Sequence, residues 1–161
     1  MAVAYSSVSS EAQANGTLTI TRPSVAADDL MIAFVFATNS LSISITPPSG
    51  WTLLASYAPN TSLVSAAWVY YKVAGGSESS TYDWVLSGGI PNNRSTGRII
   101  VVTGADTTTP IDVSATDLDT TAGLSQVNPS VTTTVANTLL IWYTMEWGNQ
   151  SASTTWTPDA A

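Results

Sequence analysis

Short runs in which apolar and polar residues alternate, each closed by a turn, constrain the fold of this chain more than any other feature. Residues 17–21 (TLTIT) and 41–45 (LSISI) place an apolar side chain at every second position. This period of two is typical of a β-strand with one buried and one exposed face. No segment of useful length shows apolar residues at helical spacing between capping residues. Ten or more such short strands predict an all-β fold, an antiparallel β-sandwich with a jelly-roll-like arrangement.

Two unbroken apolar runs stand out against this alternation. Residues 27–37 read ADDLMIAFVFA, and residues 136–146 read ANTLLIWYTME. A continuous run of β-branched and aromatic residues is typical of a strand buried on both faces, so each run is expected at the centre of a sheet. Both runs lead through a Ser/Thr-rich segment to Thr-Pro. The similarity indicates a weak internal duplication.

Two further long strands are expected at residues 63–74 and 97–103. In the first of them Trp68, Tyr70 and Lys72 share one face, because alternate residues of a strand point to the same side. Val69, Tyr71 and Val73 share the other face, and residues 97–103 are expected to form a core strand.

Weaker patterns predict a turn at residues 11–16 and an edge strand at residues 111–115. The chain is expected to form one domain, residues 1–161. In the first copy of the repeat the Thr-Pro motif opens two further strands, whereas the second copy stops at Ala161. We therefore expect either that the natural polypeptide continues, or that a neighbouring subunit supplies the last strands and an open sheet edge favours association.

Net charge limits the kinds of molecule that the chain is expected to bind. The chain carries four cations and eleven acidic residues, a formal net charge of −7, and the cations form no cluster. Nucleic acid and acidic membranes both select basic surfaces, so neither is an expected partner. The N-terminal residues lack a basic segment followed by a sustained apolar one, and the longest apolar runs are shorter than a membrane span. We expect a protein that is made in soluble form in the cytoplasm of its host.

The chain contains no cysteine and no histidine. Zinc sites built on these residues, Ser-His-Asp and Cys-His nucleophiles, and disulfides are therefore excluded. Paired carboxylates are the catalytic device that remains, since glycoside hydrolysis needs only two acids at a set separation. Asp28 and Asp29 are adjacent, but a turn at the entry to a strand explains them better than catalysis does. We expect no enzymatic activity and no required cofactor.

Acidic residues are concentrated in a second region, where the Asp-x-Asp spacing could gather oxygen ligands around Ca²⁺. The candidate ligands are Asp106, Asp112, Asp117 and Asp119. The region lacks the glycine and the terminal glutamate of an EF-hand loop. A solvated acidic loop is the alternative interpretation.

Six tryptophans are distributed over separate predicted strands: Trp51, Trp68, Trp84, Trp142, Trp147 and Trp156. Packing in the core explains most of them. Exposed aromatic faces also stack on sugars, and Trp147 and Trp156 lie beside polar loops. These two are the candidates for a carbohydrate-binding face.

An ordered series of motifs resembles a β-sandwich module of structural proteins from tailed bacteriophages and their prophages, which also occurs in bacterial surface proteins. The motifs are TPPSGWTLL (residues 46–54), WVYYKVA (68–74), YDWVLS (82–87) and GADTTTPIDV (104–113). The similarity spans most of the chain, and the series rather than any single motif carries it. In that family a further turn and strand usually follow the second Thr-Pro, where this chain stops.

The resemblance implies a role on the virion surface and no catalytic residues. The expected function is that of a structural protein of a phage-like particle, most simply a capsid decoration (cement) protein. Its expected partners are major capsid or tail proteins and other copies of itself, with a trimer at a lattice axis as the simplest assembly. The alternative is a carbohydrate-binding or host-adhesion module of a tail fibre or surface protein.

Overall fold

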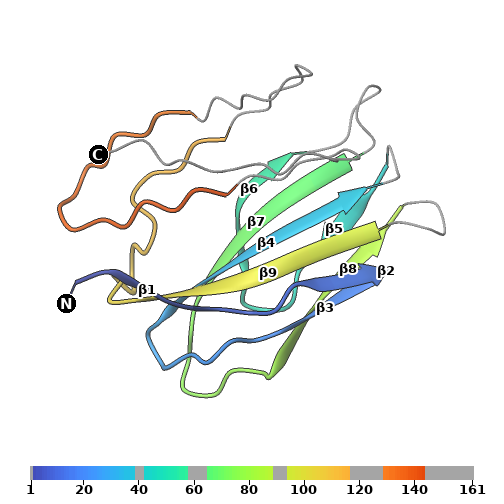
Figure 1. Cartoon of the computed structure of the whole chain (residues 1–161), viewed down its shortest axis with the longest axis horizontal. Coiled ribbons are helices and arrows are strands. Elements are labelled where there is room, and N and C mark those ends of the chain that lie inside the picture. The colour runs from blue at the N-terminus through green and yellow to red at the C-terminus, as the bar shows by residue number, and fades with distance from the viewer. Residues whose placement is uncertain (1, 39–41, 58–64, 89–93, 117–128, 144–161) are drawn as a thin grey trace, which may run out of the picture.

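The computed structural model describes residues 2–38, 42–57, 65–88, 94–116 and 129–143. Within these residues the chain forms nine β-strands in two antiparallel sheets that pack against each other (Figure 1). The large sheet has the order β1-β9-β4-β7-β6, with β2 also paired to β9, and the small sheet has the order β3-β8-β5. The predicted antiparallel all-β sandwich is confirmed.

The strands have the following bounds. The large sheet contains β1 (Ala4–Val8), β2 (Ala12–Asn15), β4 (Leu30–Thr38), β6 (Thr52–Tyr57), β7 (Ser65–Val73) and β9 (Arg94–Thr103); the small sheet contains β3 (Thr17–Thr21), β5 (Ser44–Thr46) and β8 (Thr81–Ser87).

Strand β4 is the centre of the large sheet. It pairs along its whole length with β7 on one side and with β9 on the other. Eight of its nine residues are buried, because both its edges and both its faces are covered. The unbroken apolar run that begins the chain's first repeat therefore forms the expected doubly buried strand.

The inner face of the large sheet packs on the small sheet to form the main core. The large sheet contributes Met31, Ala33, Val35, Ile99 and Val101, and the small sheet contributes Leu18, Ile20, Tyr82, Trp84 and Leu86. Trp84 is fully buried, and its ring meets that of Trp51 edge to face at 5.3 Å between centroids. The alternation in β3 thus predicted correctly that Leu18 and Ile20 face the core.

Two glycines fix the way the sheets approach each other. Gly16, at φ +97°, turns the chain from β2 in the large sheet directly into β3 in the small sheet. A Cβ atom at Gly97 would lie 2.8 Å from the carbonyl oxygen of Phe34 and 2.8 Å from Cδ1 of Ile20. The predicted turn at residues 11–16 was wrong in part, because β2 occupies most of it and pairs with β9.

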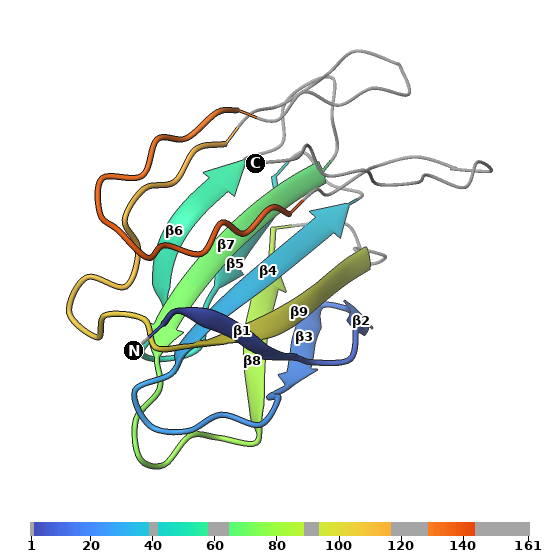
Figure 2. The same ribbon diagram turned by 60° about the vertical axis from the view of Figure 1, so that its left-hand side comes forward.

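The outer face of the large sheet, unlike the inner face, is covered by irregular chain. Leu30, Ile32, Phe34 and Val102 are buried there, although the residues that the structure describes form no third sheet to pack on them. Residues 105–116 and 129–143 cross this face as irregular chain (Figure 2). Ala105, Ile111 and Ile141 pack on the buried cluster. We call residues 129–143 the strap.

The two irregular segments on the outer face contradict two predictions. Residues 136–143, the described part of the second repeat, form no strand, and the predicted edge strand at residues 111–115 is also irregular. The apolar run predicted a strand buried on both faces, but within residues 136–143 only Ile141 is partly buried, and β7 and β9 already occupy both edges of β4. The described structure thus contains no second copy of the β4 arrangement. The rest of the predicted repeat, from residue 144 on, lies outside the described residues.

The part of the chain that the structure describes has no helix that could cross a lipid bilayer.

Candidate functional site

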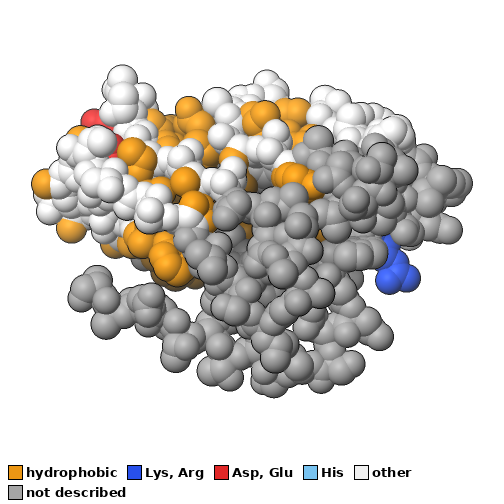
Figure 3. Space-filling view, turned by 90° about the horizontal axis from the view of Figure 1, so that it is seen from above, with side chains coloured by type: hydrophobic (Ala, Val, Ile, Leu, Met, Phe, Trp, Pro, Cys, Tyr) orange, Lys and Arg blue, Asp and Glu red, His pale blue; other side chains and the backbone are white. Residues whose placement is uncertain are grey.

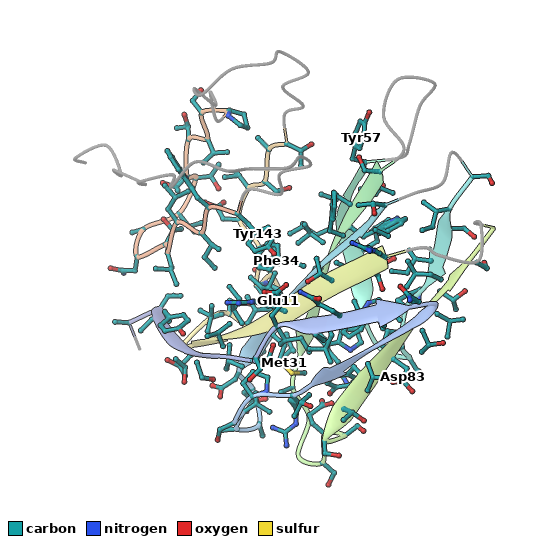
Figure 4. The ribbon with its side chains drawn as sticks, turned by 45° about the vertical axis from the view of Figure 1, so that its right-hand side comes forward. Glu11, Met31, Phe34, Tyr57, Asp83 and Tyr143 are labelled. Atoms are coloured by element: carbon teal, nitrogen blue, oxygen red, sulfur yellow. The ribbon has the colours of Figure 1, made fainter. Side chains whose placement is uncertain are left out.

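In residues 138–143, the last described part of the strap, two side chains contact the sheet although most of the segment is exposed. The ring of Tyr143 stacks on that of Phe34, with 3.9 Å between centroids and 19° between planes, and Ile141 packs on the same cluster. Figure 4 shows Tyr143 beside Phe34 on the outer face, with Met31 on the opposite side of the sheet. Tyr143 is nevertheless 44% exposed, and Leu140 and Trp142 are 57% and 53% exposed. Hydrophobic side chains are visible on the described surface in Figure 3. The segment therefore presents large apolar side chains to solvent.

Hydrogen bonds also hold an earlier part of the strap, at Thr134 and Val135. The carboxylate of Asp112 accepts hydrogen bonds from the N–H of Thr134 at 2.8 Å and from the Thr134 hydroxyl. The N–H of Val135 also donates to it, at 3.4 Å. These bonds, led by that from the Thr134 hydroxyl, lower the pKa of Asp112. One aspartate thus joins the two irregular segments that cover the outer face.

The predicted calcium ligands have other partners where the structure describes them. Asp106 accepts hydrogen bonds from the N–H groups of Thr108 and Thr109, which lower its pKa. Asp106 and Asp112 thus act as a turn carboxylate and as an anchor of the strap. The described residues contain no group of three potential metal ligands. Asp117 and Asp119 lie outside the described residues, so the calcium site stays a prediction.

The four tryptophans that the structure describes divide into three core residues and one exposed residue. Trp51, Trp68 and Trp84 are buried, as core packing predicts. Trp147 and Trp156, the two candidates for sugar stacking, lie outside the described residues. Trp142 is the exposed indole that sequence reasoning passed over. The signal that could have found it is the alternation from Leu140 to Tyr143, which places Trp142 opposite Tyr143 if only one side of the segment is covered.

A partly buried ionic cluster lies at the end of the sandwich core where β7 ends and β8 begins. Lys72 Nζ is 2.6 Å from Glu78 Oε2, and their side chains are 21% and 6% exposed. Glu78 also accepts hydrogen bonds from the Tyr82 hydroxyl and, at 2.7 Å, from the Gly75 N–H. Lys72 Nζ lies 5.4 Å from the centroid of the Tyr82 ring. The cluster joins the end of β7, the following loop and β8.

The ionisation of this cluster follows from its contacts. Burial raises the pKa of Glu78, but the hydrogen bonds from Lys72, Tyr82 and Gly75 outweigh it, so the net pKa is lowered. Burial, and then the hydrogen bond to the Glu78 carboxylate, raise the pKa of Tyr82. The result is a charged Glu78 held between a cation and a neutral phenol. One sequence signal could have found it: Lys72 shares the core-facing side of its strand with Trp68 and Tyr70, and a cation there needs a buried partner.

A shallow depression of about 420 Å³ opens above the cluster. Its lining is mostly hydroxyl-bearing and charged: Pro48, Ser49, Lys72, Ser77, Glu78, Ser79, Thr81, Tyr82 and Asp83. The Glu78 carboxylate in this lining is already bonded to Lys72, Tyr82 and Gly75. The arrangement fits a structural clamp better than a catalytic pair.

Comparison of the chain with protein-family models, with curated proteins and with solved structures finds no match in any of the three.

Proposed function

We propose that this chain is a non-enzymatic structural protein of a phage-like particle, most simply a capsid decoration protein on the virion surface. The observation that carries the proposal is the exposed apolar side of residues 138–143 on an otherwise well-packed sandwich. Leu140 and Trp142 are large, more than half exposed and adjacent on one side of the strap. Apolar residues presented in this way are typical of surfaces that bind another protein.

The motif series that resembles phage structural modules supports the same proposal, because each motif coincides with a structural element. Residues 46–54 lead into β6, residues 68–74 complete β7, and residues 82–87 lie in β8. Residues 104–113 follow β9 and begin the covering of the outer face. The β-sandwich is the fold that the resemblance implies.

The proposed mode of action is burial of apolar surface against neighbouring subunits. A chain with only 9% charged residues has few desolvation costs to overcome when it associates. We propose major capsid or tail proteins, together with other copies of this chain, as the partners. No nucleic acid or membrane contact is part of the proposal.

The first test is a count of copies in purified particles. Particles from the organism that encodes the chain would be separated by density and quantified by mass spectrometry, relative to the major shell protein. Copy numbers in the hundreds are expected for a capsid decoration protein. A handful to a few dozen copies would move the chain to the tail, and absence from the particles would contradict the virion role.

The exposed indole of Trp142 favours one alternative, a carbohydrate-binding or host-adhesion module. In that case host polysaccharide would quench tryptophan fluorescence, and Trp142→Ala would abolish the quenching. Tyr5→Ala, which removes another exposed ring, is the matched control. An unchanged fluorescence signal over a range of host polysaccharides would contradict this alternative.

A further inference from the structure

The dipeptide Asn15-Gly16 forms the corner between the two sheets. Asn15 is the last residue of β2 in the large sheet, and Gly16 turns the chain into β3 of the small sheet. The side chain of Asn15 is exposed. In the whole sequence this is the one place where a glycine follows an asparagine. Asparagine is among the thermolabile residues of proteins, and its side-chain amide can react with the backbone of the residue that follows.

Gly16 leaves this reaction unhindered. A side chain on the following residue obstructs the approach of its backbone nitrogen to the asparagine amide, and glycine has none. No described atom lies within 4 Å of the position that a Cβ atom of Gly16 would take. Asn15 also ends a strand of 4 residues, and strand ends of this kind open locally at the lowest cost in free energy. The reacting groups are on neighbouring residues, so the attack is intramolecular.

We propose that Asn15 is a self-modification site, at which the side-chain amide is converted into a carboxylate. The backbone nitrogen of Gly16 bonds to Cγ of Asn15, the bond from Cγ to the side-chain nitrogen breaks, and that nitrogen leaves with the Gly16 amide proton as ammonia. Water then adds to a carbonyl carbon of the cyclic imide and opens it. Opening of the new bond gives aspartate. Opening of the original peptide bond gives isoaspartate, whose main chain runs through the side-chain methylene group.

The aspartate product gains a partner from the sheet. Asn15 and Arg94 are opposite residues of β2 and β9, so their side chains lie on the same face of the sheet. Both side chains are exposed, and the new carboxylate can pair with the guanidinium group. Exposed ion pairs contribute little to stability. This product should therefore keep the fold of the unmodified protein.

The isoaspartate product changes the corner itself. Its main chain is longer by a methylene group, between two strands whose positions are set by pairing with β9 and with β8. The added length should disturb β2 rather than β3, because Leu18 and Ile20 of β3 are fully buried in the core. We expect the pairing of residues 12–15 with residues 94–97 to weaken. The modification would thus loosen the link between the two sheets.

Peptide mapping of stored protein tests the proposal. The folded wild-type protein would be kept at body temperature for several weeks, and mass spectrometry would follow the gain of about 1 Da that replaces the amide by a carboxylate. Asn137, the other asparagine that the structure describes, is the internal control, because it is also exposed but precedes the β-branched Thr138. We expect conversion at least about tenfold faster at Asn15. Equal rates at the two sites, or no conversion at Asn15, would overturn the proposal.

Variants test the attacking group. Gly16→Ala places a methyl group beside the backbone nitrogen and should slow conversion at least about tenfold. Because the φ of +97° at this position is strained for alanine, a thermal melt would accompany the measurement. Asn15→Gln keeps an amide with a longer side chain and should retain the fold without conversion. A folded Gly16→Ala protein that converts as fast as wild type would contradict attack by the backbone nitrogen.

Amide exchange separates the two products. The isoaspartate form, purified from stored protein, should show exchange in residues 12–15 at least about threefold faster than the unmodified protein. Asn15→Asp reproduces the aspartate product and should leave this exchange unchanged. Equal exchange in the isoaspartate form and in Asn15→Asp would contradict the predicted loosening of the corner.

Discussion

The two faces of the large sheet differ in how they are covered. The inner face packs on three strands of the small sheet, and the core between them contains fully buried side chains such as Trp84 and Val35. The outer face packs on irregular chain, which buries Phe34 and Leu30 but leaves Leu140 and Trp142 in solvent. The inner face is therefore covered more completely than the outer face, on which the exposed apolar residues of the proposed association surface lie.

The largest effect should come from the inner face. Trp84→Ala removes a fully buried indole that packs between Trp51 and Tyr82. We expect a loss of about 3–5 kcal/mol in the free energy of unfolding, measured by denaturant titration. Val85→Ala, which truncates the exposed next residue of β8, should change it by less than about 0.5 kcal/mol. Similar losses in the free energy of unfolding for the two variants would contradict the assignment of stability to the core between the sheets.

A smaller effect is expected from the ionic clamp at the end of the inner core. Glu78→Gln removes the charge that binds Lys72 and Tyr82, and we expect a loss of about 2 kcal/mol. Glu11→Gln is the matched control, because the Arg98–Glu11 pair is 45% and 41% exposed and should contribute under about 1 kcal/mol. Equal losses of unfolding free energy in the two variants would show that burial of the Lys72–Glu78 pair does not increase its contribution to stability.

The clamp also predicts a pH dependence. The pKa of Glu78 is lower in the folded than in the unfolded chain, so its contribution is complete above about pH 4.3, the ordinary value for an unfolded glutamate. It is lost as the pH falls through the folded value. The stability difference between wild type and Glu78→Gln should therefore narrow in acid. A difference that stays constant from pH 7 to pH 2 would contradict this assignment.

On the outer face the effects should be smaller. Tyr143→Ala removes the ring that stacks on Phe34, at a cost of about 1 kcal/mol. Amide exchange in residues 138–143 should rise, while exchange in β4 should change little, because both its edges remain paired. Tyr143→Phe keeps the ring and is the control. Exchange that rises equally throughout the large sheet would show that the strap is an integral part of the core.

The smallest global effect is expected at Asp112. Asp112→Ala removes the acceptor for the N–H groups of Thr134 and Val135. We expect faster amide exchange at these two residues, with the thermal transition of the sandwich unchanged. A large drop in that transition would mean that the anchor of the strap supports the whole fold. Asp106→Ala, which releases a turn within residues 106–109, is the control.

The sequence predicted the sandwich well because period-two patterns report directly on which side of a strand is buried. Leu18 and Ile20 alternate with threonines and are fully buried, as expected. The pattern was misleading at residues 136–143, because it predicted a strand buried on both faces, whereas this segment forms no strand and every residue except the partly buried Ile141 is exposed. The clamp required long-range information as well: Lys72 suggested a buried partner, but only the fold brings Glu78 and Tyr82 to it.

The pairing of β1 with β9 also sets the order in which the molecule can be assembled during synthesis. Strand β1 cannot pair until residues 100–103 have been synthesised, because these are its partners in the large sheet. All nine strands have left the ribosome once this last strand emerges, and the sandwich can close at that moment. The strap is synthesised afterwards and meets a finished sheet. Its exposed side therefore reaches solvent after the core between the two sheets can already have closed.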